Sequence, residues 1–248
     1  MQPPALTNLE FRVDEIHQTV VSWKVLKAAP ALQTIAIEGP KRTQIRVGVM
    51  KYVIMALRHG ALLNLQKLDL RIYEPLEEEE DVTNLPADFA DALEYSFCAK
   101  RLVSLRFRNC NLSAEGLRAL AGPLRRGAFP ALEELYFSGN RDMRDEGVVA
   151  LAEAMLNAAQ TSLRSLDMGN VGTRDAGYAT LASVVQQCRF DELYELGISE
   201  NGGITDKGMT ALARAIDTRG LPMLDTFDMQ DLAWTVGVRT IVDALSQR

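Results

Sequence analysis

The sequence contains few of the residues on which catalytic and metal sites most often depend. Its 248 residues include two histidines, three cysteines and only 6% aromatic residues. His17 and His59 lie on separate predicted helices, so they cannot form the i, i+4 pair of a helical metal site. Cys98 and Cys188 fall near predicted helix C-termini, where the negative end of the helix dipole disfavours a thiolate. We therefore expect a chain that is not an enzyme, with no catalytic residue, no metal site and no cofactor.

Basic charge and long apolar runs are also scarce. The net charge is -6 and the isoelectric point is about 5.1, which excludes the basic surface of a general nucleic-acid binder. No apolar run reaches the roughly 18 residues of a membrane span. The start, Met1 to Pro4, lacks the basic and then apolar segments of a signal peptide. The odd number of dispersed cysteines predicts a reduced, intracellular compartment, most simply the cytoplasm, with cytoskeletal association left open.

A repeated apolar pattern organises what is present. The clearest unit reads Leu102-x-x-Leu105-x-Phe107-x-x-Cys110-x-Leu112. The same spacing recurs, so that eight units begin near positions 6, 32, 65, 102, 132, 163, 193 and 224. The last four gaps are 30 or 31 residues, whereas the earlier gaps are irregular. A regular period of this length is typical of a repeat protein.

Each of the later units has a second half with helical spacing. A glycine lies four residues after an apolar or threonine anchor, and acidic residues stand just before three of these glycines, where a helix N-terminus favours negative charge. The glycines are Gly116, Gly147, Gly177 and Gly208. Each unit is therefore predicted to be a short strand, a turn and a helix. Parallel strands pair at about 4.8 Å, whereas helices need about 8–10 Å, so the stack must curve with its strands on the concave side.

The unit resembles the ribonuclease-inhibitor-like class of leucine-rich-repeat proteins, and the resemblance covers nearly the whole chain. It implies an α/β fold, a right-handed solenoid of about eight repeats with a parallel sheet on the concave side and helices on the convex side. In this class, an Asn or Cys side chain hydrogen-bonds the backbone of the turn inside the solenoid. Cys110, Asn140 and Asn201 match that position, whereas Val171 and Leu232 cannot make such a bond.

The whole chain, 1–248, is predicted to be a single domain without a linker. An acidic segment, 74–81, interrupts the third unit, either as a solvated loop or as a protrusion that engages a basic partner. The helix expected at 43–59 is apolar on more than one face, which favours either burial between helices or a partner-facing patch. Neither end offers a polar capping unit. The chain is then part of a longer protein, or its ends pack on something else, by self-association or in a larger assembly.

Side chains at the third, fifth, seventh and eighth positions of each unit are expected on the concave face. Units three and four are basic there and units five to eight are acidic, with Tyr136 at the junction as the best candidate for an anchor. The basic residues are Lys67, Arg71, Arg106 and Arg108, and the acidic residues are Glu134, Asp167, Glu195, Glu200, Asp228 and Asp231. These charges favour either a solvated surface or a protein-binding surface. In the second case the partner places a basic segment over units five to eight and an acidic group near Arg106 and Arg108.

The function that we expect is therefore a non-catalytic scaffold for protein–protein interaction. Three more specific roles stay open. The first is regulation of a small GTPase, because the class that the chain resembles includes such an activator, although that protein has a long acidic tail and this chain ends in Leu245-Ser246-Gln247-Arg248. The second is the ligand-sensing segment of an innate-immune receptor, and the third is a cytoskeletal or axonemal component.

Overall fold

The computed structural model describes residues 6–12, 26–39, 45–72, 85–157, 162–188, 190–217, 221–232 and 236–246. Its strands form one eight-stranded parallel sheet in sequence order. They are β1 (Asn8–Arg12), β2 (Thr34–Gly39), β3 (Lys67–Ile72), β4 (Ser104–Arg108), β5 (Glu134–Tyr136), β6 (Ser165–Asp167), β7 (Glu195–Gly197) and β8 (Thr226–Asp228). Every strand begins at the third position of a predicted unit.

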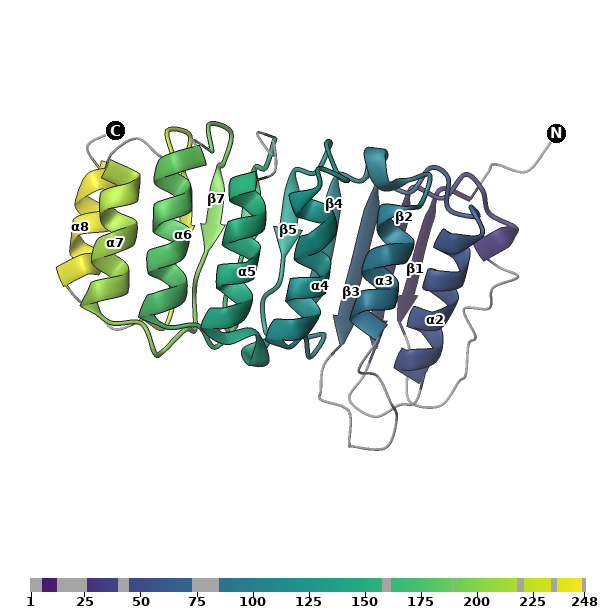
Figure 1. Cartoon of the computed structure of the whole chain (residues 1–248), viewed down its shortest axis with the longest axis horizontal. Coiled ribbons are helices and arrows are strands. Elements are labelled where there is room, and N and C mark those ends of the chain that lie inside the picture. Colours follow the sequence, from purple (N-terminus) through teal and green to yellow (C-terminus); the bar gives the residue numbers. More distant parts are fainter. Residues whose placement is uncertain are drawn as a thin grey trace.

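The helices stand in a row on one side of this sheet and lead from α2 near the N-terminal end to α8 at the other (Figure 1). They are α2 (Ile45–Arg58), α3 (Leu85–Glu94), α4 (Ala114–Arg125), α5 (Arg144–Asn157), α6 (Asp175–Cys188), α7 (Asp206–Asp217) and α8 (Val236–Ser246). Two short 3-10 helices, η1 (Ala99–Arg101) and η2 (Arg141–Met143), lie in the connections. The predicted α/β solenoid is therefore confirmed, and the sheet face opposite the helices forms its concave surface.

Rows of apolar side chains fill the space between sheet and helices. The first anchor of each unit from the second to the eighth is buried, and the second anchors stack beside them in register. The first anchors are Leu32, Leu65, Leu102, Leu132, Leu163, Leu193 and Leu224. Three residues before six of these anchors lies another buried residue, whose carbonyl accepts a hydrogen bond from the anchor N–H. These additional buried residues are Ala29, Leu62, Ala99, Phe129, Phe190 and Leu221.

The expected turn asparagines are buried and bond to two neighbouring units at once. Asn201 donates from Nδ2 to the carbonyl of Met168, one repeat earlier, and Oδ1 accepts from the N–H groups of Val171 and Gly172 at 3.0 and 3.1 Å. Val171 is fully buried, and its turn is hydrogen-bonded by Asn201 from the following unit. The sixth turn is therefore ordered although its own side chain has no polar atom.

Asn140 repeats this arrangement one step toward the N-terminus. Its Oδ1 accepts from the N–H of Leu112, and Nδ2 donates to the carbonyl groups of Phe107 and Phe137 at 2.6 Å each. Cys110 donates more weakly from Sγ to the carbonyl of Leu70 at 3.2 Å. All three side chains therefore have the backbone-bonding role that the resemblance implied.

An aspartate at the start of one helix caps the helix of the next unit. Asp145 accepts from the N–H of Gly177 at 3.0 Å, and Asp175 accepts from the N–H of Gly208 at 3.1 Å. Asp206 accepts in the same way from the N–H of Gly237 at 3.0 Å. These bonds join neighbouring repeats at the helix N-termini.

Glycine is needed where this cap is made. A Cβ on Gly177 would lie 2.1 Å from Thr173 Oγ1, and a Cβ on Gly208 would lie 2.8 Å from Asp175 Oδ1. Both are shorter than side-chain contacts allow. The repeated Asp-x-Gly sequence therefore joins one repeat to the next, beyond the favourable effect of an acid at a helix N-terminus.

The eighth position of units four to eight has the same backbone conformation throughout. Each residue there has a positive φ between 52° and 81°, in the left-handed region. They are Asn109, Gly139, Asn170, Glu200 and Asp231. Only one of the five is glycine. Three of the others are Asn or Asp, which adopt this conformation more readily than most residues, and Glu200 is the exception.

Some expectations fall outside the described residues. These are the acidic segment 74–81, His17, the second half of the first unit and the start of the helix expected at 43–59. In the described part of that helix, Val53, Ile54, Ala56 and Leu57 are buried, as the interpretation of burial between helices requires. None of the helices in the described part of the chain combines the length and hydropathy of a membrane span.

Candidate functional site

The concave face is built from side chains that the strand register aligns in rows. The third and fifth positions of adjacent strands are paired from β2 to β8. The fifth-position row reads Ala36, Asp69, Arg106, Tyr136, Asp167, Gly197 and Asp228. Within the described residues, no group of three or more His, Cys, Asp or Glu side chains is arranged to hold a metal ion. Charge and shape are therefore the properties that this face offers to a ligand.

Arg106 is already paired within the chain. Its guanidinium donates to Glu134 Oε2 at 2.7 Å and lies 4.0 Å from Asp69 Oδ2. Burial alone would raise the pKa of Glu134, but hydrogen bonds from Ser104 and Arg106 outweigh it and lower that pKa. Two of the predicted site residues, Arg106 and Glu134, therefore neutralise each other across the boundary between the basic and the acidic units.

Arg71 also has an internal partner, Glu38, at 3.9 Å. Arg108 differs, because no carboxylate of a described residue lies within 4.0 Å of it. Its guanidinium lies 4.7 Å from the centre of the Tyr136 ring, and its buried Nε has no hydrogen-bond partner. Lys67, at the third position of β3, has no ion pair with a described residue either. Of the three predicted arginines, Arg108 is thus the one without a carboxylate partner among the described residues.

Tyr136 is covered rather than exposed. Only 8% of it is accessible, and Arg106 and Arg108 lie over its ring at 4.5 and 4.7 Å. Its hydroxyl donates to Glu195 Oε2 at 3.2 Å, and Ser165 Oγ lies 2.7 Å from that hydroxyl. Burial raises the pKa of Tyr136, so the ring stays neutral. Tyr136, the predicted anchor candidate, therefore exposes little of its ring, which holds two guanidinium groups by cation–π contact.

Three of the predicted acidic residues line a common hollow, which we call the acidic groove. It has a volume of about 270 Å³ and crosses units four to eight on the concave side. Its lining consists of Asn109, Ser138, Gly139, Asp167, Gly169, Asn170, Ser199, Glu200 and Asp228. This lining holds three carboxylates and no Lys or Arg. The groove is therefore suited to a cationic group.

Each carboxylate of the acidic groove is held in place through one oxygen. Asp167 Oδ1 accepts from the N–H of Gly169 at 3.0 Å, and Asp228 Oδ1 accepts from the N–H of Gln230 at 3.1 Å. Glu200 Oε2 accepts from Asn170 Nδ2 at 2.9 Å. Among the described residues no Lys, Arg or His nitrogen lies within 4.0 Å of these carboxylates. Their negative charge is thus fixed in position but unpaired within the described part of the chain.

Glycine keeps this groove open. A Cβ on Gly197 would lie 2.8 Å from Asp167 Oδ1, and a Cβ on Gly169 would lie 2.8 Å from Ser199 Oγ. Larger residues at either position would fill the space beside the Asp167 carboxylate. The other three predicted acidic residues lie elsewhere. Glu134 is paired with Arg106, Glu195 is bonded to Tyr136, and Asp231 is exposed beyond β8.

Sequence reasoning missed some residues of this site. Asn170 and Ser199 were placed on the concave face but not singled out, and their small polar side chains give little signal alone. A detectable signal was the coincidence of glycine at Gly169 and Gly197 with acidic residues in the neighbouring rows. Two glycines beside the Asp167 carboxylate indicate an open space on the concave face rather than a packed surface.

The comparisons with known proteins agree with this architecture. A family profile described as "Leucine Rich repeat" matches residues 101–121, 130–152 and 193–213. These segments are units four, five and seven, where the predicted pattern is most regular. A comparison with curated proteins finds no significant match.

Several solved structures are similar to the chain at low sequence identity. Actin-binding site 2 of leiomodin-1 is 13% identical, with a TM-score of 0.51, and the match covers 68% of this chain and 90% of that one. The tropomodulin C-terminal domain of Caenorhabditis elegans is 12% identical, with a TM-score of 0.49 and coverage of 80% and 92%. A chain of the yeast Rad7 and Elc1 complex is 14% identical, with a TM-score of 0.40 and coverage of 94% and 72%.

The repeating strand, turn and helix, the buried anchor rows and the three matched segments lead to one classification. This chain is a leucine-rich-repeat protein.

Proposed function

We propose that this chain is a non-catalytic scaffold whose concave face binds a protein partner. The observation that carries the proposal is the set of unpaired charges held on one face. Asp167, Glu200 and Asp228 line the acidic groove, and no cationic side chain of a described residue lies within 4.0 Å of them. Arg108, on the same sheet, has no carboxylate of a described residue within that distance. Fixed charges of this kind set the specificity and the association rate of protein complexes. An intracellular location, expected from the cysteines, belongs to the same proposal.

The partner that fits this face carries both signs of charge. A lysine or arginine enters the acidic groove, and a carboxylate pairs with Arg108. The strand register separates Arg108 on β4 from Asp167 on β6 by two strand steps and from Asp228 on β8 by four. Arg108 also lies two residues, about 7 Å, further along its strand than the row of Asp167 and Asp228. With about 4.8 Å per strand step, the separations are about 12 Å and about 20 Å, which an extended segment at about 3.3 Å per residue spans with about four and about six residues.

Removing charge from the acidic groove without changing its shape tests the proposal. In D167N/D228N the amide oxygens still accept the backbone hydrogen bonds, but two negative charges are lost. The matched control is D91N/D243N, which removes two exposed carboxylates from the helical side. Partners are captured from lysate with the parent chain, identified by mass spectrometry and placed on its surface by chemical cross-linking.

We expect cross-links to concave residues, about tenfold weaker binding by D167N/D228N and parent-like binding by the control. Cross-links confined to the helices, or equal binding by both variants, contradict the proposal. Two more specific roles, in the cytoskeleton and in regulation of a small GTPase, are tested by separate assays. The similar leiomodin-1 domain is named as an actin-binding site, so the first assay is cosedimentation of this chain with actin filaments. The second assay measures whether the chain stimulates GTP hydrolysis by small GTPases.

A further inference from the structure

Exposed aromatic side chains lie just after α3, on the edge of the molecule where the helices end (Figure 1). Tyr95 is 81% exposed and Phe97 is 75% exposed. Leu63, in the loop after α2, is 41% exposed. Phenylalanine and leucine are mostly buried in proteins, and exposed apolar side chains that gather on one surface are typical of an interaction site. We call Leu63, Tyr95 and Phe97 the aromatic patch.

The turn that carries Tyr95 and Phe97 is held by the residues that alternate with them. Ser96 Oγ donates to the carbonyl of Leu93 at 2.6 Å, and Cys98 is fully buried. The N–H groups of Tyr95 and Ser96 also donate to carbonyl groups of α3, at 3.1 and 3.2 Å. Ser96 and Cys98 thus fix the turn to the protein, and the two aromatic side chains between and beside them extend outward.

The neighbouring units leave space for the ring of Phe97. This residue is the fifth before the first anchor of the next unit, and Gly60 and Gly127 hold the same position one unit earlier and one unit later. A Cβ on Gly60 would lie 3.3 Å from the Phe97 ring, so the ring rests against Gly60. A Cβ on Gly127 would meet no atom within 4 Å apart from its own chain neighbours. The ring is therefore supported toward unit two, and the equivalent position of unit four has no side chain to cover it.

Cationic side chains lie around the aromatic patch. Lys100 and Arg125 are exposed, and neither lies within 4.0 Å of a carboxylate of a described residue. Arg126, the neighbour of Arg125, donates from Nε at 2.6 Å to Glu94, which directly precedes Tyr95. This ion pair holds the end of α4 beside the patch. The charge of Arg125 is therefore close to the two aromatic side chains and has no described partner.

The balance of charge on this edge is positive, although the whole chain has a net charge of -6. The described charged residues at the ends of α2, α3 and α4 and in the turn after α3 are the basic Arg58, Lys100, Arg101, Arg125 and Arg126 and the acidic Asp88, Asp91 and Glu94. Arg58 pairs with Asp88, and Arg126 pairs with Glu94. Three basic residues then stand against Asp91 alone, so the edge favours an acidic ligand.

We propose that the aromatic patch binds an acidic segment of a partner protein in which a leucine or phenylalanine lies between carboxylates. The apolar side chain of the partner packs against Phe97 on the side of Gly127, where space is open. Carboxylates of the partner pair with Lys100 and Arg125. An apolar centre with charged groups around it is the usual arrangement of a protein interface, and aromatic residues contribute most of its binding energy.

The carboxylates near the patch favour a protein partner over an anionic membrane, which also attracts aromatic and cationic side chains. Asp91 and Glu94 lie within one helical turn before Tyr95, so a membrane that took up the ring would bring its anionic headgroups against them. This ligand is opposite in charge to the cationic group that the acidic groove fits. The patch is therefore a second binding surface, and it does not depend on the proposed role of the concave face.

The test selects ligands of the full chain from a random peptide library displayed on phage. We expect the parent chain to enrich peptides that combine Asp or Glu with Leu or Phe, and Y95S/F97S to lose this enrichment. The control Y194S/M223S removes two exposed residues before β7 and β8 and should enrich the same peptides as the parent. Enrichment of these peptides by Y95S/F97S, or none by the parent, overturns the proposal.

Affinities of a selected peptide, measured by fluorescence polarisation, test the charges. K100Q/R125Q should bind it at least tenfold more weakly, whereas K207Q/R239Q, which loses the same two charges from exposed positions of α7 and α8, should bind it like the parent. D167N/D228N should also bind it like the parent, so this proposal and the scaffold proposal fail separately. Equal loss in K100Q/R125Q and K207Q/R239Q overturns the proposal.

Two other occupants of the patch are tested with the same variants. Sedimentation of the parent at increasing concentration detects a second copy, and flotation with vesicles of phosphatidylcholine and phosphatidylserine detects a membrane. We expect Y95S/F97S to behave like the parent in both assays. A dimer or a vesicle-bound chain that Y95S/F97S abolishes would assign the patch to that occupant and overturn the proposal.

Discussion

The carboxylate of Asp145, at the start of α5, accepts a hydrogen bond of 2.7 Å from the hydroxyl of Thr173, which precedes α6. The same carboxylate accepts from the N–H groups of Arg174 and Gly177. In D145A these three donors lose their acceptor and α6 loses its cap. We expect a loss of about 1–2 kcal/mol in the free energy of unfolding, the usual size of a helix-cap deletion. Urea denaturation followed by circular dichroism measures it, with E146A as the exposed control; an equal loss in E146A would contradict the cap.

Acid should weaken the same connections between repeats. Burial raises the pKa of Asp145 and of Asp175, but hydrogen bonds from the neighbouring unit outweigh it and lower both. A lowered pKa in the folded chain means that the stabilisation is present above the unfolded value, about 3.9, and is lost as pH falls through the folded value. We expect D145N/D175N to lose less stability than the parent between pH 5 and pH 2, measured as the shift in urea midpoint. A parent curve parallel to that of the variant would be the contrary result.

The buried amide of Asn201 should contribute more than an ordinary surface asparagine. N201A leaves the N–H groups of Val171 and Gly172 and the hydroxyl of Tyr178 without their partner. Unpaired buried groups cost about 1–3 kcal/mol each, so we expect a total loss of about 2–4 kcal/mol after relaxation. Thermal and urea unfolding measure it, with N64A, a partly exposed asparagine, as the control. A loss no larger than that of N64A would show that Asn201 does not order this turn.

Adding an asparagine at position 171 should not help, although the repeat pattern favours one there. Val171 is fully buried, and Asn201 already bonds the N–H of its turn. V171N therefore buries a second amide among apolar neighbours, and we expect it to destabilise the chain by about 1–3 kcal/mol. Differential scanning calorimetry of V171N beside V171A separates the buried amide from the lost methyl groups. A more stable V171N would mean that the sixth turn is incompletely bonded.

Spacing of charge should determine which peptides the concave face accepts. Extended peptides with a Glu and an Arg about four or about six positions apart fit the distances from Arg108 to Asp167 and to Asp228. We expect these peptides to bind more tightly than a peptide of the same composition with the two charges adjacent, by fluorescence polarisation at low salt. In R108Q the preference for spacing should disappear. Affinity that depends only on peptide composition would rule out this two-site recognition.

The anchors of the fold could be predicted because they follow a period that physics ties to structure. Leu105 and Phe107 have the spacing of a strand whose alternate residues face a core, Leu102 precedes them by a fixed three residues, and all three are buried. The connections between repeats were harder to predict. Asp145 was interpreted as a favourable charge at its own helix N-terminus, whereas its hydrogen bonds go to the following helix. A bond between residues 32 positions apart depends on how two repeats stack, which no local pattern describes.

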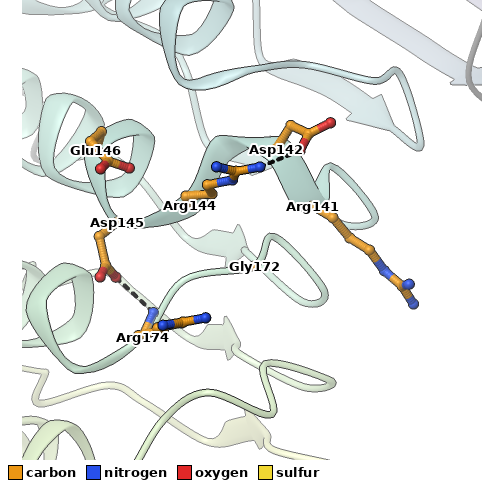
Figure 2. A pocket seen from close by; sticks show the side chains of 7 residues that line it. All are labelled: Arg141, Asp142, Arg144, Asp145, Glu146, Gly172 and Arg174. Atoms are coloured by element: carbon orange, nitrogen blue, oxygen red, sulfur yellow. Dashed lines mark hydrogen bonds and ion pairs between the residues drawn. The ribbon is translucent and has the colours of Figure 1, made fainter.

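The candidate site shows the same division. The sequence placed Arg106 and Glu134 on one face with correct signs of charge, but not that they pair with each other at 2.7 Å. Pairing depends on register and rotamer, so the charges left for a partner are fewer than the charges counted. The hollow lined by Arg141, Asp142, Arg144, Asp145, Glu146, Gly172 and Arg174 was not predicted at all (Figure 2). Its residues belong to the turns and helix starts of two units, and only the stacking of those units brings them together.

The positive φ at the eighth position of units four to eight limits which residue types this surface can accept. Asn109, Asn170, Glu200 and Asp231 tolerate that backbone conformation, but valine or isoleucine there would be strained. The exposed strand positions can therefore change to many residue types during evolution or design. The eighth positions accept only the few residue types that adopt a positive φ. Glu200, which lines the acidic groove, is at one of these positions. Within the acidic groove, position 200 is therefore the carboxylate position at which the fewest substitutions keep the backbone conformation.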